Sequence, residues 1–146
     1  MSSGLVAIAS TTVKAPVERV WEALVSPHII KEYMFGTQVV SGWKEGSSIV
    51  WKGEWQGMKS EDKGTILKLE PQRMISYSHF SPLSGSPDVP ENYHTVTIEL
   101  SRNKNGTLVT LTQDNNPDEE ARQPSEQNWG MMLSSLEKFL EKKRST

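Results

Sequence analysis

The sequence predicts an α+β fold: a curved antiparallel sheet of about six to seven strands wrapped around a long C-terminal helix, with two short helices after the first strand. In the closing segment, large apolar residues recur at spacings of three and four, which draws one apolar stripe along a helix. In most of the chain before it, short runs alternate between apolar and polar residues, which is typical of strands. An apolar helix stripe must be buried, and a sheet that curves around the helix is the simplest partner.

The first elements are a strand and two short helices. Residues 5–13 alternate loosely and predict the strand. The helices are predicted at residues 16–25 and 27–34, and each starts with a proline at its first position, where the missing N–H costs nothing. Gly36 ends the second helix. The apolar stripe of the first helix comprises Val17, Val20, Trp21, Leu24 and Val25.

The rest of the sheet is predicted from six short runs. They are residues 37–42, 47–56, 62–70, 74–80, 93–101 and 107–115. Asn105 and Gly106, between the last two runs, form a strong hairpin-turn signal. The stretch 81–92 is rich in Ser, Pro and Gly and has no periodicity, so it predicts a mobile flap. We interpret the acidic pair Glu61 and Asp62 as a solvated turn rather than as paired catalytic carboxylates.

The long helix is predicted from about Asp118 to Lys143. Its apolar stripe comprises Trp129, Met132, Leu133, Leu136, Phe139 and Leu140. Acidic residues gather near its start and basic residues near its end, as the helix dipole favours. Pro124 suits only the first turn of a helix and Gly130 is a weak point, so we expect the helix to start late or to bend.

Composition narrows the possible functions. With 146 residues the chain is long enough for one domain with a proper core, and its net charge of -2 offers no basic field for nucleic acid. The absence of cysteine excludes disulfides and thiolate nucleophiles. No segment has the pattern of a secretion signal or the length and apolarity needed for membrane insertion, so we expect a cytoplasmic protein.

No catalytic constellation is visible in the sequence. There is no GxSxG motif, no serine placed beside a histidine and an acid, and no glycine-rich phosphate loop. His28, His79 and His94 lack the spacing of a metal motif, and cysteine ligands are absent. We therefore expect no metal centre, no bound cofactor and no identifiable catalytic residue.

Four stretches of the sequence resemble one known family. VKAPVERVWEALVSP is similar to the family's opening, where a strand leads into a helix that starts with proline and carries a Val-Trp pair. GTILKLEPQRMISYSH is similar to its middle, VTIELSRNKNGTLVTLTQ to its last hairpin, and NWGMMLSSLEKFLE to its final helix. Over residues 6–143 the chain resembles the START-like (SRPBCC, birch-pollen-allergen-like) superfamily. Within it, the nearest likeness is the family named after the activator of the heat-shock-protein-90 ATPase.

The resemblance implies the helix-grip fold, with a cavity between the long helix and the concave face of the sheet. In the superfamily such cavities hold small hydrophobic or amphipathic molecules, lipids among them, so the resemblance implies a ligand-binding protein. Two alternatives stay open. One is an enzyme, such as a cyclase or hydrolase, acting in the same cavity. The other is an interaction module that regulates a chaperone or another protein. A monomer and a homodimer are both compatible with the sequence.

The candidate cavity residues follow from that fold. The following large apolar side chains either line the cavity or fill it as core: Met34, Phe35, Trp51, Trp55, Trp129, Met132 and Leu133. His79 shares a strand face with Tyr77. It is either a core histidine hydrogen-bonded to Tyr77, a serine or the backbone or, with Tyr77, an anchor that orients a ligand. Acid–base chemistry by Tyr77, His79 or Glu54 rests on analogy between folds alone. The segments 33–36 and 81–92 would gate entry.

Overall fold

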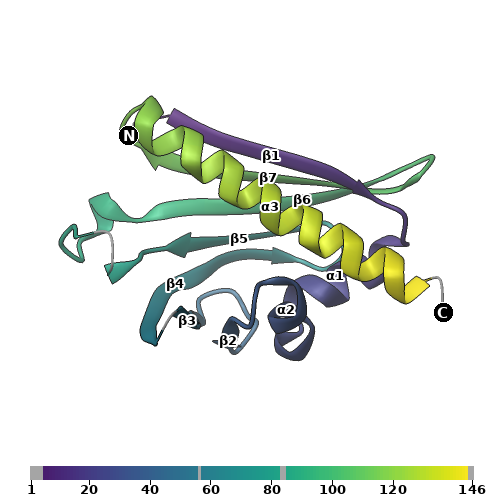
Figure 1. The fold of residues 1–146 in the computed structure, drawn as a ribbon, viewed down its shortest axis with the longest axis horizontal. Coiled ribbons are helices and arrows are strands. Elements are labelled where there is room, and N and C mark those ends of the chain that lie inside the picture. Colours follow the sequence, from purple (N-terminus) through teal and green to yellow (C-terminus); the bar gives the residue numbers. More distant parts are fainter. Residues whose placement is uncertain (1–4, 56, 83–84, 145–146) are drawn as a thin grey trace.

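In the part of the chain that the structure describes, seven antiparallel strands form one sheet in the order β1-β7-β6-β5-β4-β3-β2 (Figure 1). The computed structural model describes residues 5–55, 57–82 and 85–144, with only the backbone of Trp55, Lys143 and Arg144. The strands are β1 (Leu5–Val13), β2 (Gln38–Ser41), β3 (Ser48–Trp55), β4 (Met58–Glu70), β5 (Met74–His79), β6 (His94–Asn103) and β7 (Gly106–Asn116). From β2 to β7 each strand pairs with the next one along the chain. The first strand, β1, pairs with β7 and forms one edge of the sheet.

Three α-helices among the described residues accompany the sheet, and their positions confirm the predicted α+β architecture. They are α1 (Val17–Val25), α2 (Pro27–Tyr33) and α3 (Glu119–Arg144); a short 3-10 turn, η2 (Pro90–Asn92), lies within the 81–92 stretch. Figure 1 shows α3 crossing the sheet obliquely, from beside the start of β1 to the neighbourhood of α1. No helix among the described residues has the length and the apolar run needed to cross a membrane.

The core lies between α3 and the concave face of the sheet. On α3 the predicted stripe is buried at Met132, Leu133, Leu136 and Leu140, while Trp129 and Phe139 are half-buried. On the strands the burial alternates: Val96, Ile98 and Leu100 of β6 face the core, and Glu99 is exposed. Opposed apolar faces of this kind are what hold a helix against a sheet.

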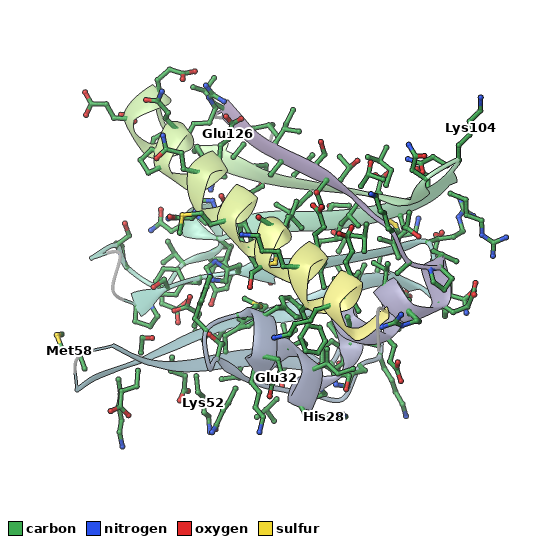
Figure 2. All side chains as sticks on the ribbon, turned by 45° about the vertical axis from the view of Figure 1, so that its right-hand side comes forward. His28, Glu32, Lys52, Met58, Lys104 and Glu126 are labelled. Carbon is green, nitrogen blue, oxygen red and sulfur yellow. The ribbon has the colours of Figure 1, made fainter. Side chains whose placement is uncertain are left out.

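The first correction concerns the start of β4. Our interpretation of Glu61 and Asp62 as a solvated turn is wrong, because β4 begins at Met58 and both residues lie within the strand. The pairing between β3 and β4 continues to Trp55 and Met58, so this hairpin extends beyond the core (Figure 2). Its residues near Met58 are mostly polar and none of them is fully buried, so the sequence lacks the apolar–polar alternation that marks a half-buried strand.

The second correction concerns Pro124, which lies inside α3 and beyond its first turn. The helix begins earlier than the proline predicts because Asp118 caps it: the N–H of Ala121 donates to Asp118 Oδ1 at 3.0 Å. Pro124 is exposed, so the carbonyl group that loses its N–H partner lies near water. The helix continues through Pro124 and Gly130 without interruption.

The outer edge of β1 is covered by glutamates of α3. The N–H of Ile8 donates to Glu126 Oε2 at 3.0 Å, and the N–H of Lys14 donates to Glu141 Oε2 at 3.0 Å. Between them, the Thr11 hydroxyl donates to Glu137. Figure 2 shows Glu126 beside this strand. Edge N–H groups that would otherwise be open to another strand are thus occupied by carboxylates.

Candidate functional site

A cleft of about 340 Å³ lies between the first half of α3, strands β3 to β5 and the segment that joins α2 to β2. We call it the first cleft. Its apolar walls are Met34, Phe35, Trp51, Trp129 and Met132. Its polar walls include Ser60, Asp62, His79, Gln113, Ser125 and Asn128. A mostly apolar concavity with a few convergent polar groups is the usual form of a small-molecule site.

The aromatic side of the cleft is a packed cluster of rings from β3 and β5, the two strands that flank β4. The ring of Trp51 lies 5.0 Å from that of Tyr77 and 5.1 Å from that of His79, between centroids. The contact with His79 is edge-on, a favoured geometry for aromatic pairs. Since each ring restricts the others, this wall is preorganised for a ligand that packs against it.

An aspartate orients the histidine of the cleft. His79 Nε2 lies 2.9 Å from Asp62 Oδ2, and both side chains are mostly buried. A carboxylate accepts hydrogen bonds, so Nε2 carries the proton and donates, and Nδ1 becomes the acceptor nitrogen of a neutral ring. Nδ1 is buried and has no hydrogen-bond partner among the described residues. His79 is thus a mostly buried histidine held by a neighbouring polar side chain, and its second ring nitrogen is an unpaired acceptor buried at the wall of the cleft.

A second polar pair joins α3 to the sheet. Trp129 Nε1 donates to Gln113 Oε1 at 3.0 Å, and Gln113 itself is buried on β7. This bond fixes the indole ring at the wall of the first cleft while satisfying a buried amide oxygen.

Beyond this pair lies a second cleft, of about 430 Å³, which shares His79, Gln113 and Ser125 with the first. Its other walls come from η2, the start of β6 and the end of β7. They include Glu91, Asn92, His94, Asn115 and Asn116. The two clefts meet at the shared residues, and the second is the more polar in its side chains.

The structure brings together most of the predicted site residues. Those that line the first cleft are Met34, Phe35, Trp51, His79, Trp129 and Met132. Tyr77 instead faces a small inner cavity of about 30 Å³, where burial raises the pKa of its phenol, and Leu133 is packed in the core. The side chain of Trp55 lies outside the part of the chain that the structure describes.

Two polar residues of the site were not predicted from the sequence. Asp62 was assigned to a turn, although it precedes Gly64 and Ile66 at the spacing of two that marks one face of a strand. Gln113 continues the buried positions Val109 and Leu111 at the same spacing. A polar residue that interrupts a buried strand face was the available signal for both. Among the described residues, no three His, Asp or Glu side chains are grouped so that they could hold a metal ion.

The fold and the cleft define a class of protein: a helix-grip domain in which one long helix lies across a curved sheet. The family model described as "Activator of Hsp90 ATPase homolog 1-like protein" matches residues 14–141. The chain therefore belongs to this family, which confirms the resemblance found in the sequence. A comparison with curated proteins finds no match.

Solved structures show the same fold. The solution structure of ChR145 from Cytophaga hutchinsonii is 60% identical, with a TM-score of 0.85 and full coverage of both chains. Protein MLL2253 from Mesorhizobium loti is 22% identical, with a TM-score of 0.77 over 94% of this chain and 98% of that one. The Aha1 dimer from Colwellia psychrerythraea is 20% identical, with a TM-score of 0.71 over 91% of this chain and 93% of that one. The last two show likeness of fold alone.

Proposed function

We propose that this protein binds a small hydrophobic or amphipathic molecule in the first cleft. The observation that carries the proposal is the combination of a preorganised aromatic wall with a buried acceptor, His79 Nδ1, that has no partner among the described residues. The cleft volume of about 340 Å³ lies at the lower end of the range for small-molecule sites, about 300–1,000 Å³. Family membership supports the proposal, since the fold places its concave face under a single helix.

Apolar contact supplies most of the affinity in this proposal. Each Å² of apolar surface that the ligand and the cleft remove from water contributes about 25 cal/mol. The polar groups orient the ligand instead. A hydrogen bond from the ligand to His79 Nδ1 removes the free-energy cost of leaving that nitrogen buried and unpaired, which is about 1–3 kcal/mol.

Acid–base catalysis in the same cleft is the second candidate, and one observation favours it. Asp62 holds His79 as a carboxylate holds the imidazole of a general base, with the second ring nitrogen left as acceptor. Of the other predicted candidates, Tyr77 has a raised pKa through burial, and Glu54 is exposed. NMR spectra of bound compounds test this role, because turnover produces new ligand signals and simple binding leaves the ligand unchanged.

A thermal-shift screen of the whole chain tests the binding proposal. The library contains lipids, sterols, flavonoids and polyketide-like aromatics. A compound at 100 times its Kd adds about 2.7 kcal/mol of stability and raises the Tm by a few degrees. No shift with any class overturns the proposal.

Two variants of α3 show whether a shift arises in the first cleft. Asn128 lines the cleft, and Asn128→Trp places a large ring at its wall. Gln127 is its exposed neighbour outside the lining, so Gln127→Trp is the matched control. Binding in the first cleft requires that the shift disappears in Asn128→Trp and persists in Gln127→Trp. A shift that persists in Asn128→Trp shows that the compound binds elsewhere.

A further inference from the structure

The first and second clefts meet at His79, Gln113 and Ser125, and their walls differ in chemistry. We infer that together they form one bipartite site for an amphiphile whose polar end donates hydrogen bonds, an ammonium group above all. This inference rests on the proposed function and specifies its ligand. The apolar part of the molecule lies in the first cleft against Trp51 and Trp129, and the polar end lies toward His94 and Glu91 in the second.

Charge is the first argument. Asp62 lines the first cleft and Glu91 lines the second, whereas no described lining residue of either cleft is Lys or Arg. A carboxylate or phosphate head group would lose its hydration here without gaining a cationic partner. An ammonium group in the second cleft would gain the Glu91 carboxylate, and Asp62 adds a further negative charge in the adjoining first cleft.

Hydrogen-bond accounting is the second argument, and it starts with the donors. Three asparagine amides line the second cleft, and all three already donate to backbone carbonyl groups. Asn92 Nδ2 donates to Pro87 O at 2.8 Å and Asn115 Nδ2 to Glu91 O at 2.8 Å. Asn116 Nδ2 donates to Leu5 O at 3.0 Å. These three asparagine amides are therefore engaged with the backbone of the protein, Asn115 and Asn116 through two bonds each.

The acceptor groups of the second cleft include the rings of two histidines, His79 and His94. His94 Nδ1 lies 2.8 Å from the carbonyl oxygen of Asp114, so Nδ1 carries the proton and Nε2 is the acceptor of a neutral ring. His79 is held by Asp62 in the opposite tautomer, with Nδ1 as its acceptor. The two rings are neighbours, 6.4 Å apart between centroids. His94 Nε2 and the Glu91 carboxylate are thus acceptors of the second cleft that suit a ligand supplying donors, and His79 Nδ1 is a further acceptor buried at its wall.

Three probes with one aromatic body test the inference: naphthylmethylamine, naphthylmethanol and naphthoate. Their affinities for the full chain are measured by isothermal titration calorimetry. The amine is expected to bind about tenfold or more tightly than the carboxylate, with the alcohol between them, because bonds to charged partners are the stronger ones. Equal or tighter binding of naphthoate overturns the inference and leaves the binding proposal intact. If none of the three binds at millimolar concentration, both fail.

Matched variants show which carboxylates cause the preference for the amine over the carboxylate probe. Asp62→Asn and Glu91→Gln are each expected to reduce the advantage of the amine over the carboxylate several-fold, since each removes one negative charge from the lining. Glu91 is exposed, so its variant is informative even if Asp62→Asn disturbs the fold. Glu61→Gln removes a carboxylate from an exposed position on the same strand as Asp62 and is the control. An advantage that survives both cleft variants, or falls equally in Glu61→Gln, overturns the inference.

Discussion

Trp129 Nε1 and Gln113 Oε1 are joined by a hydrogen bond of 3.0 Å at the boundary between the two clefts. The bond links the long helix to β7, which lies next to the edge strand of the sheet. Gln113 is 6% exposed, so water has little access to its amide. The bond therefore combines two roles: it satisfies a buried group, and it fixes one wall of the proposed site.

Removing only the donor is expected to destabilise the protein. Trp129→Phe keeps an aromatic ring and leaves Gln113 Oε1 buried without its partner, at a cost of about 1–3 kcal/mol in the free energy of unfolding. Urea denaturation measures this cost. In the double variant with Gln113→Leu neither partner remains, and part of the lost stability is expected to return. A double variant whose loss equals the sum of the two single losses would show that the bond contributes nothing.

Two glycines are expected to respond to alanine in opposite directions. A Cβ on Gly64 would lie 1.7 Å from the carbonyl oxygen of Ser78, so Gly64→Ala must push β4 and β5 apart and is expected to cost roughly 3 kcal/mol. A Cβ on Gly130 meets nothing within 4 Å, so Gly130→Ala in α3 is expected to stabilise the protein by roughly 0.5–1 kcal/mol. Thermal unfolding of both variants checks the prediction, and equal Tm values would contradict it.

Phe35 at the mouth of the first cleft is expected to reduce stability. It has a φ of 57° at the turn that ends α2, where the N–H of Gly36 donates to Lys31 O at 2.9 Å. Such turns favour glycine at this position, and the phenyl ring is 73% exposed, so it gains little by packing. Phe35→Gly is expected to raise the free energy of unfolding by roughly 0.5–1 kcal/mol.

Phe35→Ala is the matched control for that prediction, because alanine removes the ring and keeps the strained backbone. It is expected to be less stable than Phe35→Gly in the same urea experiment. If alanine and glycine give the same stability, the cost lies in the exposed ring rather than in the backbone.

Asp88 is expected to contribute to the acid sensitivity of the fold. Hydrogen bonds from Lys63 and Tyr93 lower the pKa of its carboxyl group. When a carboxyl group has a lower pKa in the folded than in the unfolded protein, its contacts stabilise the fold at pH values above the usual pKa range of carboxyl groups. This stabilisation is lost as the pH falls through the folded-state pKa. Between about pH 6 and about pH 3, Asp88→Asn is therefore expected to lose less stability than the parent protein. Urea midpoints across this range measure the difference.

Glu61→Gln controls for the loss of any exposed carboxyl group. If it flattens the pH dependence as much as Asp88→Asn does, the contribution attributed to the contacts of Asp88 is wrong. Added salt provides a further check, since screening weakens the ion pair between Asp88 and the exposed Lys63.

The order and type of the helices and strands could be predicted because each one buries a face. The alternation in β6 and the apolar stripe on α3 both follow from the burial of one face of the element. Both elements begin and end within about two residues of the prediction. The start of β4 could not be predicted in this way, since the hairpin that carries Met58 extends into solvent and leaves no apolar pattern. Pro124 misled only the expectation that α3 starts late or bends, because the Asp118 cap fixes its start near the predicted position.

The candidate site was predictable in part. Trp51 and Tyr77 have the same kind of pattern in the sequence, yet Trp51 lines the first cleft and Tyr77 faces the inner cavity. The difference depends on where α3 lies over the sheet, which strand periodicity does not specify. The bond between Asp62 and His79 depends on the pairing of strands more than a dozen residues apart, and this pairing becomes visible only in the folded sheet.

The glutamates of α3 that bind the edge of β1 also limit how copies of this chain can associate. Endless fibres built by adding strand to strand require two open edges on every molecule. Here Glu126 and Glu141 occupy N–H groups of one edge, and the four-residue strand β2 forms the other. Growth through β2 alone joins two sheets and then stops. The helix that covers the core thus also prevents strand-by-strand polymerisation through the edge formed by β1.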